Sequence, residues 1–114
     1  SNLDSISSLI LIKENPILPN LTGLDNIEGL NTSSVINISE NDALVDISGL
    51  SPMANSLGGV FIINNTALVN LPDLSGVNQI DGFLTISGNP QLTSLSDLAA
   101  ITSVDNLLID NNAG

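Results

Sequence analysis

An asparagine recurs along this chain at nearly even spacing, and apolar residues stand at fixed distances on either side of it. The steps between successive asparagines are 26, 24, 24 and 23 residues. Such self-similarity is typical of repeat architectures, in which each unit buries its apolar edge against the next. The asparagines are Asn15, Asn41, Asn65, Asn89 and Asn112. Isoleucine stands three positions before each of them, at Ile12, Ile38, Ile62, Ile86 and Ile109, and leucine stands three positions after the first four, at Leu18, Leu44, Leu68 and Leu92.

The spacing of the apolar residues changes within each unit. Before the asparagine it is two, which predicts a β-strand with alternating faces. After the asparagine it is three, which suits short extended or 3₁₀-like arcs better than a strand or an α-helix. We therefore predict a mainly β protein with little α-helix: a right-handed parallel β-solenoid with 23–26 residues per coil. Residues 1–114 would form a single segment of about four and a half such repeats.

Each asparagine stands where its strand has to turn. An asparagine amide can donate to and accept from backbone groups that a turn leaves unpaired. Because the same residue stacks at the same position of successive units, we predict a ladder of amide hydrogen bonds along the repeat. Its members are Asn15, Asn41, Asn65, Asn89 and Asn112.

The units resemble leucine-rich repeats, and more closely the receptor L-domain version of them. The resemblance is clearest in QIDGFLTISGNPQLTSLSDLAAITSVDNLLIDNN, residues 79–112, which looks like the pattern Ile-x-Gly-x-Leu-x-Ile-x-x-Asn followed by leucine at every third place. The resemblance covers the whole chain and implies a secreted or cell-surface protein that recognises other molecules. Animal receptor L domains carry cysteines and this chain has none. We therefore expect a bacterial exported relative, with a fungal wall protein as the second choice, rather than a hormone-receptor ectodomain.

The composition excludes several functions. Lys13 is the single basic residue against 12 acidic ones, and the net charge is −11. Nucleic acid is excluded as a partner, because a phosphate backbone needs Lys and Arg to neutralise it. No segment has the length and hydrophobicity that membrane insertion requires. The chain has no His and no Cys, so the usual general base and activated nucleophile are missing, and we expect neither enzyme activity nor a cofactor.

The residues two and four positions before each asparagine should point away from the core. Solenoid proteins use such a sheet face for binding. Phe61 and Ile63 would form an apolar spot on this face, which can mark a contact site, although such residues can also pack under a neighbouring domain or simply be tolerated. The candidate binding residues are Leu11, Lys13, Asn37, Ser39, Phe61, Ile63, Thr85, Ser87, Leu108 and Asp110.

Three acidic residues give a weak candidate for a calcium site. Glu14 and Glu40 occupy the same position of adjacent units, and Asp42 stands near them. Two or three carboxylates and turn carbonyls could supply the oxygen ligands that calcium takes. The chain has no D-x-D-x-D spacing, so the sequence favours solvated turn residues over a metal site.

The function that we expect is that of a non-catalytic module of a secreted or cell-surface protein, mediating adhesion or protein or glycan recognition through the sheet face. One alternative is a structural spacer or stalk without a ligand of its own, and another is a calcium-stabilised module. Both ends of the chain fall inside a repeat, which predicts that it is part of a longer protein. Its partners would then be an unknown protein or glycan ligand and the adjoining repeats or domains of the same chain.

Overall fold

The computed structural model describes residues 9–15, 17, 34–47, 56–71, 74, 76–92, 95 and 98–112. Within these ranges the chain forms five β-strands and no α-helix. None of the described segments is a helix that could cross a membrane. The strands are β1 (Leu9–Lys13), β2 (Val35–Ser39), β3 (Ser56–Ile63), β4 (Gln79–Ser87) and β5 (Ser103–Asp110).

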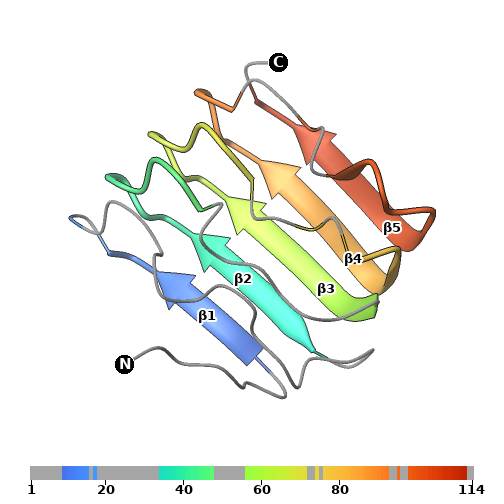
Figure 1. Ribbon diagram of the computed structural model, residues 1–114. Helices are drawn as coiled ribbons and strands as arrows, with labels where there is room; N and C mark the ends of the chain where they lie inside the picture. The colour runs from blue at the N-terminus through green and yellow to red at the C-terminus, as the bar shows by residue number, and fades with distance from the viewer. Residues whose placement is uncertain are drawn as a thin grey trace.

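The five strands form one sheet in the order β1-β2-β3-β4-β5, and each neighbouring pair is parallel. Figure 1 shows the arrows side by side and pointing the same way. The prediction of a mainly β, all-parallel architecture with little helix is confirmed for the described part of the chain. Such a sheet is compatible with a solenoid, because every parallel neighbour requires a crossover connection.

The register of the sheet follows the sequence repeat. Along one row of the sheet, Ile12 pairs with Ile38, Ile38 with Ile62, Ile62 with Ile86 and Ile86 with Ile109. Residues at equal distances from the asparagine therefore stack directly on one another across all five strands. A position that repeats once per unit in the sequence thus becomes a continuous row of side chains across the sheet.

The core lies on the face of the sheet that holds the isoleucines. Ile36, Ile38, Val60 and Ile62 are completely buried there. Apolar residues from the segments after each asparagine close the core from the other side, namely Leu44, Ile47, Leu68, Leu71, Leu74, Val77 and Leu92. Full burial of one such aliphatic side chain contributes about 1.5–3 kcal/mol. Leu18, predicted for the same role, lies outside the described residues.

Hydrogen bonds join the five asparagines into a ladder just beyond the ends of the strands. Asn41 donates to the Oδ1 of Asn65 twice, from its backbone N–H at 3.2 Å and from its Nδ2 at 3.1 Å. The same two bonds run from Asn15 to Asn41, from Asn65 to Asn89 and from Asn89 to Asn112. The Oδ1 of each of the last four asparagines thus accepts two hydrogen bonds from the preceding unit.

The last four ladder amides also donate to the preceding strand. The Nδ2 of Asn65 donates to the carbonyl of Ile38 at 2.9 Å. The same bond recurs from Asn41 to Ile12, from Asn89 to Ile62 and from Asn112 to Ile86. Because Asn41, Asn65 and Asn89 are completely buried, their amides cannot turn to water and depend on these partners.

The backbone carbonyls of the asparagines accept the hydrogen bonds that close the turns. The backbone N–H of Leu44 donates to the carbonyl of Asn41 at 3.2 Å, and the bonds from Leu68 to Asn65 and from Leu92 to Asn89 are equivalent. These turns bring the leucine three residues after the asparagine into the core, where all three leucines are buried. The side-chain amide of each asparagine thus links neighbouring units, while its backbone carbonyl stabilises the turn within its own unit.

Replacing the central asparagine should destabilise the fold. Asn65→Ala removes the acceptor of the buried backbone N–H and side-chain amide of Asn41 and takes one donor from the carbonyl of Ile38, at a cost of about 1–3 kcal/mol. Asn15→Ala is the matched control, because Asn15 is only partly buried and ends the ladder. Urea unfolding should give a clearly smaller loss for the control. Equal losses, or a neutral Asn65→Ala, would contradict the role of the ladder.

Candidate functional site

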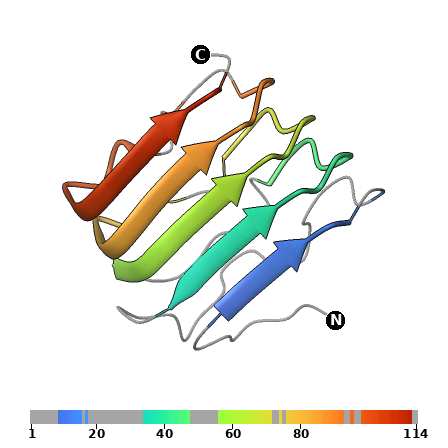
Figure 2. The same ribbon diagram turned by 180° about the vertical axis from the view of Figure 1, so that it is seen from behind.

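The face of the sheet opposite the core is not covered by any described segment. Figure 2 shows this face with the five strands in front. Two rows of residues cross it, since the register aligns the positions two and four before each asparagine. One row runs through Leu11, Asn37, Phe61, Thr85 and Leu108. The other runs through Lys13, Ser39, Ile63, Ser87 and Asp110.

The predicted binding residues differ in how accessible they are. The four on the edge strands β1 and β5 are exposed, namely Leu11, Lys13, Leu108 and Asp110. On the inner strands Asn37, Phe61, Ile63, Thr85 and Ser87 are half-buried. Ser39 is only 7% exposed. It lies between Lys13 and Ile63 in the register, and these longer side chains flank it, so it offers little surface to a ligand.

Phe83 belongs to this face and was missed by the sequence reasoning. Its side chain is 54% exposed, and its ring centroid lies 6.3 Å from that of Phe61 with an interplanar angle of 33°. These two are the only aromatic residues of the chain, so all of its aromatic surface gathers at one place. A signal was present in the sequence, because Phe83 stands six positions before Asn89 and shares the alternation of Thr85 and Ser87.

Glycines make room for the two rings. Gly59 lies directly across from Phe83, and a Cβ at residue 59 would come within 3.2 Å of the Phe61 ring. Gly82 packs against the carbonyl oxygen of Gly58 so closely that a Cβ there would overlap it. Strand β4 carries one extra residue at this point relative to β3, which is a β-bulge. The local backbone thus depends on glycine at residue 82.

The polar neighbour of the aromatic pair is incompletely bonded. Asn37 pairs with Phe61 across the strands, and its Oδ1 is buried with no hydrogen-bond partner among the described residues. A buried acceptor without a donor is unfavourable by about 1–3 kcal/mol.

The three acidic residues considered for calcium line one shallow hollow. Glu14, Glu40 and Asp42 surround it together with Asn64 and Thr66, and its volume is about 450 Å³. Within the described ranges, however, no three carboxylates are grouped so that they could hold a metal ion. The Nζ of Lys13 lies 3.8 Å from the Oε1 of Glu40. Both side chains are about half exposed, so this ion pair contributes little to stability.

The residue before each ladder asparagine has a left-handed backbone. The φ angles are 57° at Glu14 and Glu40, 56° at Asn64, 54° at Asn111 and 69° at Gly88. Asparagine and glycine adopt this conformation readily, whereas glutamate is disfavoured there. In four units the N–H of this residue donates to the carbonyl that ends the next strand, which explains why the conformation recurs.

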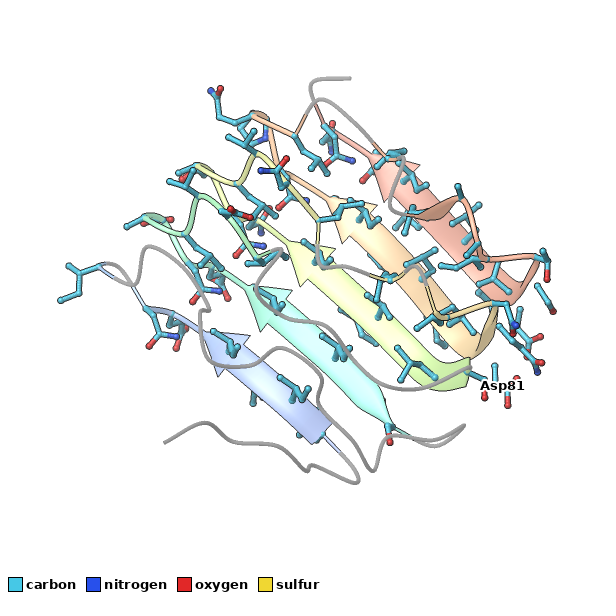
Figure 3. The ribbon with its side chains drawn as sticks, in the orientation of Figure 1. Asp81 is labelled. Carbon is cyan, nitrogen blue, oxygen red and sulfur yellow. The ribbon has the colours of Figure 1, made fainter. Side chains whose placement is uncertain are left out.

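Another acidic side chain lies far from this hollow. Figure 3 labels Asp81 near the start of β4. The asparagine ladder lies beyond the opposite ends of the strands. The carboxylate of Asp81 accepts a hydrogen bond from the Nε2 of Gln79. The carboxylates of the described residues are thus spread over both ends of the strands.

Comparison with known proteins adds no constraint. No family model matches the chain, no curated protein matches it, and no solved structure matches it. The candidate site therefore depends on the geometry described above, with Phe61, Phe83 and their neighbours on the open face as its centre.

The left-handed position of Glu40 leads to a stability prediction. Glu40→Asn should stabilise the protein by about 0.5–1 kcal/mol, because asparagine tolerates this backbone better. Glu40→Gln is the matched control, since it removes the same charge without that preference. Urea unfolding of both variants separates the two effects. If Gln stabilises as much as Asn, charge repulsion in the acidic hollow is the cause and the backbone argument is wrong.

Proposed function

We propose that this chain is a recognition module of a secreted or cell-surface protein, of the leucine-rich, receptor L-domain-like kind, with no catalytic activity. In this proposal the units form a right-handed parallel β-solenoid. The in-register parallel sheet and the repeated ladder support the proposal. The right hand follows from the general rule that parallel crossover connections are right-handed in nearly all proteins.

The observation that carries the proposed function is the placement of Phe61 and Phe83. An aliphatic protein with two aromatic residues would ordinarily bury them, because aromatic side chains hold much apolar surface. Here both lie in contact on the uncovered face, and Phe83 is more than half exposed. Exposed apolar spots with a polar rim mark contact sites, and aromatic residues are enriched at the centres of interfaces.

The class of ligand follows from the surroundings of the rings. Asn37, Thr85 and Ser87 supply amide and hydroxyl groups around them, while the net charge of −11 disfavours anionic partners. An apolar spot with neutral hydrogen-bonding neighbours suits a neutral glycan or an uncharged or basic protein surface. Adhesion or recognition outside the cell is the role that fits these ligands, and the source that we propose is bacterial.

The proposed site can be tested by removing both rings. The double substitution Phe61→Ser and Phe83→Ser should weaken binding to any ligand found on a glycan array or an extracellular protein panel by about tenfold or more. Val45→Ser is the matched control, because Val45 is an exposed apolar residue away from the sheet. Circular dichroism should show that both variants stay folded.

Two other outcomes would favour the alternatives. If the unmodified chain binds nothing on either panel, a spacer without its own ligand becomes the better interpretation. If millimolar calcium raises the melting temperature and Glu40→Gln removes that gain, the chain is a calcium-stabilised module. Binding that survives the loss of both rings would contradict the placement of the site on this face.

A further inference from the structure

A carboxylate lies beside the aromatic pair on the open face of the sheet. Ile80 and Leu84 of β4 are buried in the core, so the alternation of the strand turns Asp81 and Phe83 to the opposite face. Both of these residues are exposed, and Figure 3 shows Asp81 near the start of β4. Residues two apart on one strand are about 7 Å apart. Asp81 is therefore the acidic neighbour of the Phe83 ring.

This group of side chains does not depend on the edges of the sheet. Phe61 stands on β3, and Phe83 and Asp81 stand on β4. Each of these strands is paired on both sides. Further parallel strands would be added at the edges of the sheet and would leave this face of β3 and β4 open. The group is therefore the same whether or not further repeats adjoin the chain.

The charge of Asp81 has no basic side chain to match it. The Nε2 of Gln79 donates a hydrogen bond to its carboxylate, but this amide is neutral. The only basic residue of the chain, Lys13, lies on β1, three strands from β4, which is about 14 Å at the usual strand spacing. Its Nζ lies 3.8 Å from the Oε1 of Glu40. A cation at the rings must therefore come from a ligand.

An exposed aromatic ring beside an unmatched carboxylate suits a cationic ligand. The face of a ring attracts a lysine ammonium or an arginine guanidinium placed over it, and the carboxylate attracts the same group. A guanidinium can satisfy both, because it is planar, stacks on aromatic faces and carries N–H donors along its edges. A neutral sugar can contact the ring and hydrogen-bond the carboxylate, but it leaves the negative charge unmatched.

We propose that the ligand of this face is a basic protein segment, with one of its arginine or lysine side chains against Phe61 and Phe83 and the charge of that side chain beside Asp81. This proposal rests on the proposed function, since it assigns the class of ligand to the same recognition site. The net charge of −11 attracts such a partner from a distance and speeds the encounter. The rings supply the apolar contact, and Asp81 fixes where the cation lies.

Two peptides that differ only in charge test the proposal on the unmodified chain. One is acetyl-Gly-Arg-Gly-Arg-Gly-amide, and the other has citrulline in place of each arginine. Citrulline keeps the length and planarity of arginine but is neutral. In an NMR titration the arginine peptide should shift the ring resonances of Phe61 and Phe83. The citrulline peptide should bind about tenfold more weakly or less, because it lacks the attraction to the rings and to the acidic surface.

Substitutions at the site show which groups recognise the charge. Asp81→Ser should weaken binding of the arginine peptide about threefold, the size expected for an exposed charge pair, and should leave the citrulline peptide unaffected. Asp42→Ser is the matched control: it removes the same charge from an exposed residue beyond the other ends of the strands and should leave binding nearly unchanged. Phe83→Leu keeps an apolar side chain but removes the ring, and it should also weaken the arginine peptide about threefold.

The outcomes distinguish this proposal from the proposed function. If the two peptides bind equally, or if the neutral glycan maltotriose shifts the ring resonances more than the arginine peptide does, the ligand class is wrong while recognition by the rings stands. An arginine peptide that leaves the ring resonances in place at millimolar concentration would also overturn the proposal. So would equal losses in Asp42→Ser and Asp81→Ser, which would show only a general attraction to an acidic chain. The proposed function fails by a separate result, namely panel ligands that bind equally well after both rings are removed.

Discussion

The fold depends on the asparagine ladder, a row of hydrogen-bonded amides inside an otherwise aliphatic core. Apolar packing alone does not fix the register of neighbouring strands, because a slip of two residues still stacks apolar residues such as Ile38 and Val60 on one another. The ladder removes this freedom, since a buried Asn65 amide finds all its partners only when Asn41, Asn89 and Ile38 stand in one arrangement. A slipped register would leave several buried polar groups unpaired. The ladder thus specifies the register of the strands, while the leucines and isoleucines supply most of the stabilising free energy.

The ladder also determines how side chains are arranged on the open face of the sheet. Because it holds every strand at the same register, residues at equal positions form straight rows on the open face as well as in the core. The rows allow two residues distant in the sequence, Phe61 and Phe83, to meet on neighbouring strands. The proposed recognition site thus follows from one periodic constraint.

Most of the architecture could be predicted from the sequence, because spacing alone identifies the strands, their parallel order and the ladder positions. The details of the candidate site could not. The exposure of Phe83 depends on the bulge beside Gly82, and a bulge leaves no periodic signal when it occurs in one unit. The near-complete burial of Ser39 depends on longer neighbours in adjacent strands, which only the register brings beside it. Spacing likewise could not reveal the left-handed backbone at Glu14 and Glu40, since glutamate is an unusual choice there.

Hydrogen exchange of the asparagine side-chain amides, followed by NMR, tests the ladder most directly. The Nδ2 protons of Asn41, Asn65 and Asn89 should exchange as slowly as the backbone amides of the inner strands β3 and β4, because they are buried and hydrogen-bonded on both sides. The exposed side chain of Asn78 gives the unprotected reference within the same molecule. If the three buried amides exchanged as fast as that of Asn78, the ladder would not be what holds the units in register.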